Sequence, residues 1–495
     1  MRNSLQIVFS VCLICLLGLA IPFLVPMYAT AMSNILIVIV ALLLAVTVTK
    51  GRIGVHEWLI IFLVLIPLHS FTIGSELFFL RLTEIAFIPF FAVWLFQKRT
   101  GTHPAQRSFP PEYSIVFFFV ALSFISMYKA EVVLVSLHRT MILTYLAVFS
   151  YIVWDILAGN KQKIFMVVRA MVVIASITGG IGILQAFIPQ LYPFYHRGYM
   201  TIAGINIIRA GAGWYDPSYF GLYLSMTIPL TVSLLRSDLF FNNKKVLRYC
   251  LWVQWGGLLA SGSRASIIAT FVAYLFLLWV GKKQKIAFTI LVLVILFVSI
   301  AFVGMPYVYN EFPALAAFMF RIPHLQTVMV RPELILGWRL DAWRANIAMF
   351  LDNPFIGVGP FMAGYRYKDY YPKDHLYPFT DILHPHSEYL SLLSERGFFG
   401  FILFCGFLIV LFHRASTVMR ARPNAFNGGV TRGITAGIIS FLVFSITGAS
   451  IYAIQFWLMA GMLIAASSVT DDGGEPGRSY PENRSSPAAA VPGQE

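Results

Sequence analysis

Long apolar segments recur along nearly the whole chain, and most of them are long enough to cross a lipid bilayer. The hydrocarbon core of a bilayer is about 30 Å thick, so a helix needs about 20 apolar residues to span it. Only 12% of the 495 residues are charged and 58% are hydrophobic, whereas a soluble domain carries about 25% charged residues. Too few charges remain to cover a water-soluble surface, so the sequence indicates a polytopic membrane protein.

We expect an all-α membrane protein with about twelve to fourteen transmembrane helices and one large outer loop. Helical segments of sufficient apolar length are predicted at residues 4–28, 32–49, 57–74, 77–97, 113–128, 140–158, 164–188, 217–235, 247–262, 264–280, 286–304, 388–412, 432–449 and 452–469.

The positive charges between these segments predict the orientation of the chain. Lys and Arg concentrate in cytoplasmic loops, so the net charge of +14 is attributed to orientation and not to nucleic-acid binding. With the N-terminus inside, the basic loops fall on one side, and the opposite loops are short and nearly uncharged. The two exceptions are residues 189–216 and 305–387, which are both expected outside. Lys and Arg cluster on the inner side near positions 50–52, 98–107, 161–163, 236–248, 282–285 and 414–432.

Four parts of the chain are expected from this pattern. Residues 1–304 contain transmembrane helices 1–11, and residues 305–387 form the large outer loop. Residues 388–469 contain helices 12–14. Residues 470–495 are rich in Pro, Gly and Ser, which predicts a disordered cytoplasmic tail.

Three charges fall inside predicted spans, where ionisable residues commonly have a function. Arg81 and Glu84 are three residues apart, so they can neutralise one another, and a structural pair is an equal alternative. Arg169 has no partner nearby in the sequence. A transporter or lipid flippase would use such charges, and it is the main alternative to an enzyme; a structural subunit of an envelope complex is a third.

The outer loop contains a predicted helix over residues 336–351. Its expected apolar face consists of Leu336, Leu340, Trp343, Ile347 and Phe350, with Arg339 and Asn346 on the opposite side. The helix should end at Asp352-Asn353-Pro354, because proline disfavours helix in the preceding residue. A tight turn follows at residues 357–360. The helix either lies on the membrane surface or packs against the loop's own Tyr365, Tyr367, Tyr370 and Tyr371.

Arginine and histidine side chains on the predicted outer side are the candidate functional groups. Arg264 lies in a very short turn of small residues, against the positive-inside tendency. Its forked guanidinium group suits phosphate, although an interfacial arginine is the alternative. His384 and His386 end the loop, and with Arg264 and Arg339 they indicate acid–base chemistry near a phosphate. A metal site that adds His375 and Asp381 matches no standard spacing and is disfavoured.

Five segments follow one another along the chain: Arg209–Gly221, Ser263-Arg264, Arg339–Trp343, Pro354–Gly359, and His386–Leu390 with Glu395–Gly397. In this order they resemble the motifs of the O-antigen ligase and O-antigen polymerase superfamily of bacterial envelope glycosyltransferases. The resemblance covers about residues 200–410. Ser218 and Ser387 stand where that family usually has asparagine.

This resemblance implies transfer of a glycan from a polyprenyl diphosphate carrier to an acceptor hydroxyl, at the periplasmic face of the bacterial cytoplasmic membrane. The acceptor is lipid A–core in ligases and another repeat unit in polymerases, and the sequence leaves both open. We expect no cofactor and no metal, because arginines can stabilise the diphosphate charge. The expected catalytic residues are His386, Arg339 and Arg264, and the expected substrate-binding residues are Arg209, which steers the headgroup, Trp343 and His384.

Overall fold

The computed structural model describes most of the chain in eleven stretches. These are residues 54–68, 72–74, 79–100, 108–188, 199–202, 205–235, 244–293, 338–372, 384–421, 426–448 and 450–469. The first two predicted spans, the predicted tail, and most of the predicted outer loop, including His375 and Asp381, lie outside the described residues.

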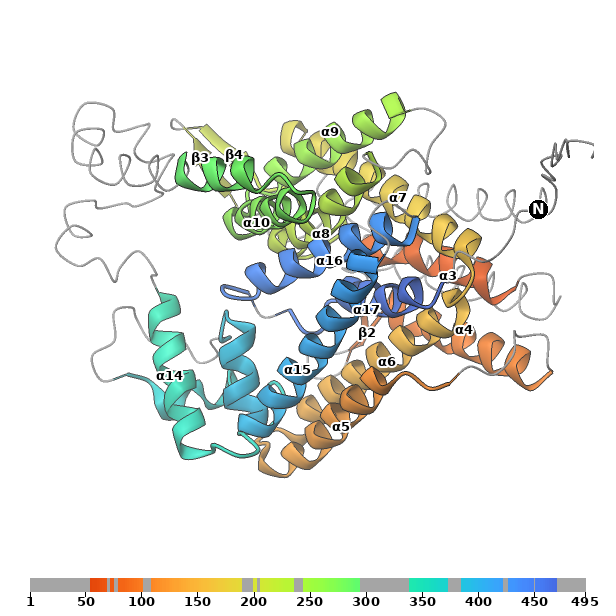
Figure 1. The fold of residues 1–495 in the computed structure, drawn as a ribbon. Helices are drawn as coiled ribbons and strands as arrows, with labels where there is room; N and C mark the ends of the chain where they lie inside the picture. Colours follow the sequence, from red (N-terminus) through yellow and green to blue (C-terminus); the bar gives the residue numbers. More distant parts are fainter. Residues whose placement is uncertain are drawn as a thin grey trace, which may run out of the picture.

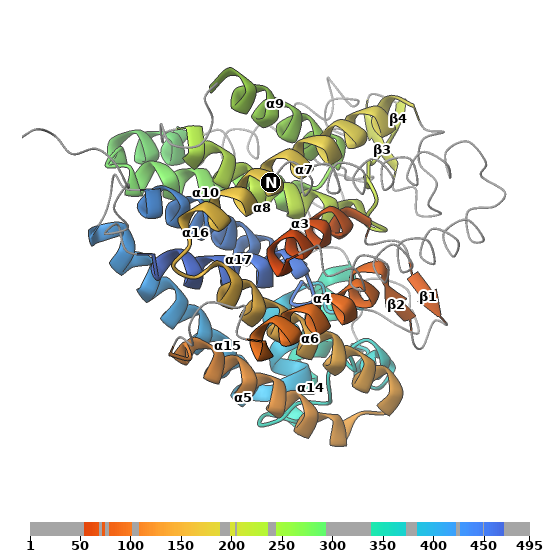
Figure 2. The same cartoon turned by 90° about the vertical axis from the view of Figure 1, so that its right-hand side faces the viewer.

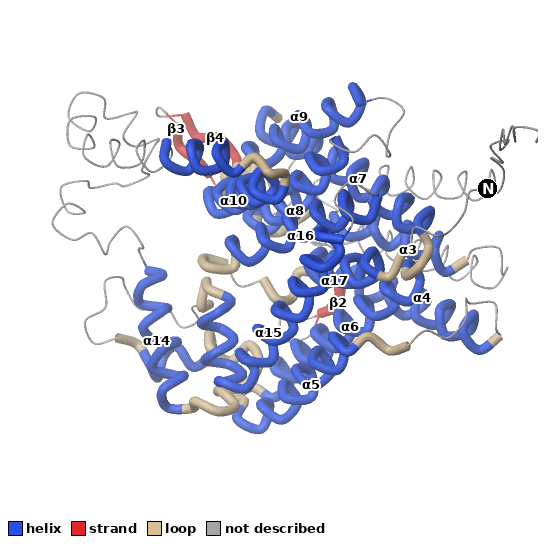
Figure 3. Tube along the Cα trace, viewed as in Figure 1, coloured by secondary structure: helices blue, strands red, loops and turns tan. Residues whose placement is uncertain are grey.

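Helices dominate the described residues, as expected (Figure 3). The first half contains α3 (Val55–Leu65), η2 (Ile66–Leu68), α4 (Leu82–Arg99), α5 (Pro111–Ser126), η3 (Met127–Lys129), α6 (Val133–Leu157) and α7 (Lys161–Phe187). The second half contains α8 (Pro217–Leu235), α9 (Lys244–Ala260), α10 (Arg264–Val280), a helix over Gln284–Leu293, α14 (Trp338–Asp352), η6 (Tyr365–Tyr370), α15 (Glu388–Ala421), α16 (Phe426–Phe444) and α17 (Ile454–Ser467).

Two short antiparallel hairpins depart from the all-α prediction. Strand β1 (Thr72–Gly74) pairs with β2 (Phe79–Arg81), and β3 (Tyr199–Ile202) pairs with β4 (Ile205–Ile208). The span predicted over 57–74 therefore ends in a strand. The span predicted over 77–97 begins only at Leu82, because the Glu84 carboxylate accepts the Arg81 backbone N–H at 2.9 Å and caps α4 there.

Five helices of the described part are long and apolar enough to cross a membrane. They are α5 continued by η3, α6, α7, α8 and α15. Shorter apolar helices include α3, α10, α16 and α17. With so many apolar helices, the protein is a multi-pass membrane protein.

The helices pack as a layered bundle. Helix α5 packs against both α6 and the long α15, and the three helices lie close together in both views (Figures 1 and 2). Helix α8 contacts α9, α10 and α16, while α7 packs along α9. Helix α17 is buried almost completely against α6 and α16, with Phe441 and Phe456 stacked at 4.2 Å between ring centroids.

Helix α14 is present and ends at Asp352 as predicted, and the side that packs on the protein is not the predicted apolar face. The buried side chains are Asp341, Ala342, Ala345, Asn346 and Met349, while Ile347 is 48% exposed. Burial of Asn346 is possible because the Ser394 hydroxyl on α15 donates to its Oδ1 at 2.6 Å. Ala345 and Met349 share an apolar cluster with Tyr367, so one side of the helix packs against the loop, and a placement of the apolar face on the membrane surface stays a prediction.

The turn after α14 is fastened to a kink in α15. Gly357 (φ +70°) and Gly397 (φ +66°, ψ −168°) have positive φ angles, and backbones of this kind cost L-residues about 1–3 kcal/mol. A Cβ on Gly397 would lie 2.3 Å from the carbonyl carbon of Phe355, and a Cβ on Gly357 would lie 2.3 Å from that of Glu395. Backbone N–H groups of Val358 and Gly359 donate across this contact to α15. Two of the sequence motifs thus form one structural unit.

Candidate functional site

Arg209 joins the segment between β4 and α8 to the turn between α9 and α10. Its Nε donates to the Ser261 carbonyl oxygen at 3.0 Å, and its Nη2 donates to the Ser218 hydroxyl at 3.2 Å. The side chain is half-buried. The sequence assigns Arg209 only to steering, whereas these two hydrogen bonds give it a positioning role as well.

The start of α8 is set by a capping carboxylate. Asp216 Oδ1 accepts the Ser218 backbone N–H at 2.7 Å, and Pro217 occupies the first helical position, where its missing N–H costs nothing. One turn later, a Cβ on Gly221 would lie 2.8 Å from the Ser266 hydroxyl and 2.9 Å from that of Ser261. A glycine there lets α8 meet the α9–α10 turn, which places Arg209 beside Ser261.

Arg264 is exposed and is the first residue of α10. The preceding Ser263 caps the helix, since its side chain accepts the Ser266 backbone N–H. A helix N-terminus carries a partial positive charge and its N–H groups attract anions. A guanidinium group at this position therefore adds a full positive charge to an end that already favours an anion.

Arg339, on the first turn of α14, lies near both other arginines. Burial lowers the pKa of its guanidinium group, and the positive charges of Arg264 and Arg209 lower it further. The three arginines come from elements far apart in the sequence, and the fold gathers them. Arg264 is exposed while Arg209 and Arg339 are half-buried, and three guanidinium groups whose charges act on one another suit an anion that carries more than one charge.

His386 lies beside this arginine cluster, two residues before α15 begins. Its backbone is left-handed (φ +47°), and the Glu388 backbone N–H after it donates to the Ser445 carbonyl oxygen at 2.9 Å. Burial and the positive charge of Arg339 lower the pKa of His386 to about 4, with a contribution from His384, while Asp216 acts in the opposite direction. The imidazole is therefore neutral at pH 7 and able to accept a proton.

His384 and Trp343 are placed differently around His386. The His384 ring lies 5.1 Å from that of Phe361, and although the side chain is partly exposed, surrounding protein atoms and the charge of Arg139 lower its pKa. The Trp343 indole is half-buried on α14, and no described residue accepts a hydrogen bond from its Nε1. His384 thus joins the histidine pair, and Trp343 lies one helical turn after Arg339 on α14.

Two residues of this site have no assigned role in the sequence interpretation. Asp216 was part of a motif, and its position before a proline is a helix-start signal that predicts its capping role. Arg139 stands one residue before the span predicted over 140–158. Like Arg264, it is an arginine at the predicted outer end of a span. This exception to the positive-inside rule is the sequence feature that indicates a functional arginine.

The other candidates for ionic function lie elsewhere or have structural contacts. Among the described residues, no group of three or more His, Cys, Asp or Glu side chains is arranged to hold a metal ion. The Arg169 side chain, on which a transporter interpretation relied, is exposed on α7 with its guanidinium group 5.0 Å from the Phe165 ring.

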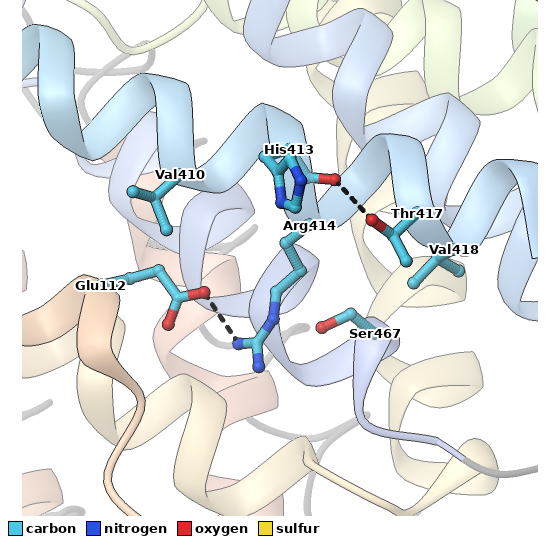
Figure 4. A pocket seen from close by; sticks show the side chains of 7 residues that line it. All are labelled: Glu112, Val410, His413, Arg414, Thr417, Val418 and Ser467. Carbon is cyan, nitrogen blue, oxygen red and sulfur yellow. Dashed lines mark hydrogen bonds and ion pairs between the residues drawn. The ribbon is translucent and has the colours of Figure 1, made fainter.

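A pocket of about 300 Å³ lies at the far end of α15 (Figure 4). Its lining is dominated by Arg414, which pairs with the buried Glu112 at 3.1 Å, and it also includes His413 and Thr417. No predicted site residue lines it. The pocket therefore belongs to the end of the bundle opposite His386.

The fold and the site together define a multi-pass helical membrane protein with an arginine–histidine centre at one end of its bundle. Residues 249–405, from α9 to the first half of α15, match the family model described as O-antigen ligase. This match confirms the resemblance to the O-antigen ligase and polymerase superfamily, and it contains Arg264, Arg339, His384 and His386. No curated protein matches the chain.

Proposed function

We propose that the protein transfers a glycan from a polyprenyl diphosphate carrier to an acceptor hydroxyl. The observation that supports this most strongly is the convergence of Arg209, Arg264 and Arg339 beside a neutral His386. A polyprenyl diphosphate is an activated leaving group, so the reaction needs no nucleotide. It needs positive charge where the diphosphate gains charge, and a base for the acceptor.

The proposed reaction is a single displacement at the anomeric carbon of the donor glycan. The acceptor oxygen forms a bond to that carbon as the bond from the carbon to the diphosphate oxygen breaks. His386 takes the proton from the acceptor hydroxyl. Arg264 and Arg339 bind the departing diphosphate, and Arg209 holds the α9–α10 turn on which Arg264 stands.

Binding of the donor should strengthen His386 as a base. In the free protein, Arg339 disfavours the imidazolium form. A bound diphosphate neutralises the arginines and places negative charge nearby, so it raises the pKa of His386. The base is thus weak before the donor binds and stronger when the reacting groups are assembled.

We further propose that this site faces the periplasm of the bacterial cytoplasmic membrane, with both termini in the cytoplasm. The Lys and Arg distribution supports this orientation. In that orientation His386 and the arginines lie at the outer ends of their helices, where a lipid-linked glycan and its acceptor meet. The acceptor class, lipid A–core or a second repeat unit, is a matter of experiment.

The test is glycan transfer by the purified protein from a polyprenyl-diphosphate donor, with each acceptor class supplied separately. Wild-type protein should form product with one of them, and His386→Ala should reduce turnover about 10²- to 10⁴-fold at equal protein level. His384→Ala is the matched control and should be milder. Wild-type activity in His386→Ala, or transport of the lipid without transfer, would refute the proposal.

A further inference from the structure

A second basic group lies next to the histidine pair, on the side of His384. Arg139 of α6 places its guanidinium carbon 3.8 Å from the centre of the Phe361 ring and 5.9 Å from that of Tyr452. The Phe361 ring in turn contacts His384. Arg139 is thus one aromatic ring away from His384, the neighbour of the proposed base His386.

The aromatic groups around Arg139 are held firmly. Phe361 has a left-handed backbone (φ +63°), and its N–H donates to Glu395 Oε2 at 2.8 Å. The Tyr452 hydroxyl accepts a hydrogen bond from the fully buried Arg396 at 2.8 Å. Contact with aromatic faces orients a guanidinium group but leaves its positive charge in place. The structure therefore presents a fixed charge and not a flexible surface arginine.

A second arginine adds to this charge. Arg81, at the start of α4, is close enough for its charge to act on Arg139, and both act on the Tyr219 hydroxyl. The acid within reach of both is Glu84, which caps α4 through the Arg81 N–H. The charged groups that act on Arg139 itself are Arg81 and Glu84, whereas Asp216 and Glu388 act with the two arginines on Tyr219. Around Arg139 two arginines therefore face one carboxylate, and a local excess of positive charge attracts an anion.

The histidine pair separates this group from the arginines assigned to the donor. Arg339 is the arginine whose charge acts on His386, whereas Arg139 is the one that acts on His384. If the diphosphate occupies the Arg264–Arg339 side and His386 is the base, the acceptor hydroxyl approaches from beyond His386. Arg139 contacts the histidine pair through Phe361 and His384, so an anion bound at Arg139 would lie next to His384 and close to the proposed base.

We propose that Arg139 and Arg81 form an anion subsite for the acceptor, which binds a carboxylate or phosphate group on the glycan close to its reacting hydroxyl. The inference rests on the proposed transfer reaction and specifies its acceptor as an acidic glycan. An arginine fork grips either group through paired N–H donors, so the subsite would orient the acceptor hydroxyl toward His386.

Equilibrium binding and steady-state kinetics test this together. The probes are an oligosaccharide with a terminal hexuronic acid, its carboxyl-reduced neutral counterpart, and a phosphorylated counterpart. The variants are Arg139→Gln and Arg81→Gln, with Arg169→Gln, which changes an exposed arginine outside the site, as the matched control. Each purified protein is first checked for wild-type thermal unfolding.

We expect wild-type protein to bind an acidic probe more tightly than the neutral one, and Arg139→Gln to weaken that binding about 10- to 100-fold. In transfer assays the same variant should raise the acceptor KM by a similar factor and leave the donor KM unchanged. Arg81→Gln should have a smaller effect in the same direction, and Arg169→Gln none.

Three results would overturn the subsite. The first is equal binding of the acidic and neutral probes by wild-type protein. The second is a rise in the donor KM alone in Arg139→Gln, which would place the anion on the donor. The third is an equal loss of activity in Arg139→Gln with acidic and neutral acceptors, which would mean that Arg139 only positions Phe361. Because binding is measured without turnover, an absence of transfer together with Arg139-dependent binding would refute the transfer reaction and not the subsite.

Discussion

At the scale of single residues, His386 is the proposed base that takes the proton from the acceptor hydroxyl. Its low pKa in the free protein has a physical cause, since burial and Arg339 both oppose a positive imidazole. A histidine with a lowered pKa stays neutral, and so competent as a base, until the pH falls close to that pKa. The pH dependence of turnover is therefore predicted to separate the free protein from the donor complex.

We predict that kcat/KM stays constant from neutral pH down to about pH 5 and declines only as the pH approaches about 4, because kcat/KM reports the free protein. The acid limb of kcat should lie at higher pH, because bound diphosphate raises the pKa of His386. Full pH profiles measured under saturating and limiting donor check both limbs. An acid limb of kcat/KM near 6.5, the ordinary value for histidine, would contradict this.

The sequence predicts candidate site residues but not their contacts. Arg264 and His386 are predicted from their place at span ends and Arg339 from the polar side of the loop helix, and in the structure the charge of Arg339 acts on His386 and that of Arg264 acts on Arg339. Their catalytic roles stay predictions. The Arg209 hydrogen bonds to Ser261 and Ser218 depend on how α8 meets the α9–α10 turn, which no local pattern contains. The position of Arg139 at the outer end of a span is visible in the sequence, but its contact with Phe361 is not, because the two residues are more than 200 positions apart.

At the scale of elements, the contact between the turn after α14 and the kink in α15 holds Phe361 in place, since its N–H donates to Glu395. Gly397→Ala is predicted to destabilise the protein, because the backbone of Gly397 (φ +66°, ψ −168°) costs an L-residue about 1–3 kcal/mol and the added Cβ would overlap Phe355. We expect a lower unfolding temperature and a large loss of transfer.

Gly406→Ala is the matched control on the same helix. A Cβ at Gly406 meets no atom within 4 Å, and alanine is favoured over glycine inside a helix by about 0.5–1 kcal/mol. Its unfolding temperature should equal or exceed that of wild type. Equal behaviour of the two variants, measured by thermal unfolding in detergent, would show that the kink is not structurally required.

Element boundaries followed the apolar pattern in some helices and departed from it in others. Helices α8 and α10 begin and end where predicted, since a cap fixes the start of each, whereas α4 begins only at Leu82 and α6 already at Val133. The protein-facing side of α14 is not predicted by its apolar spacing, because Asn346 there accepts a hydrogen bond from Ser394 on another helix. Apolar spacing can identify a helix, but a partner from elsewhere in the chain decides which side of it is covered.

At the scale of the whole molecule, the site forms where several helices begin together. The first residues of α8, α10 and α15, and Tyr452 just before α17, all lie around the histidines and arginines. The partial positive charges of these helix ends add to those of the arginines. In the orientation that the Lys and Arg pattern predicts, this end of the bundle faces the periplasm.

A topology measurement checks that orientation. In protein lacking the native cysteines, Asp369→Cys and Asn427→Cys are introduced singly, and intact cells are treated with a membrane-impermeant thiol reagent. We predict labelling at position 369, where the side chain is exposed beside Arg366, and none at position 427. Labelling of position 427 alone would mean the opposite orientation, and labelling of both positions would mean that the two lie on the same side of the membrane. Either result would contradict the proposed topology.

The most direct test of the central claim is glycan transfer by Arg264→Lys and Arg339→Lys, measured with purified polyprenyl-diphosphate donor in the presence of EDTA. Lysine keeps the charge but lacks the planar pair of N–H donors. Loss of one such transition-state contact costs about 2.7–4 kcal/mol in comparable sites. We predict that wild-type protein is fully active in EDTA. Each lysine variant should be nearly as inactive as the corresponding alanine variant at normal protein levels. Wild-type rates in both lysine variants would mean that these arginines do not bind the diphosphate.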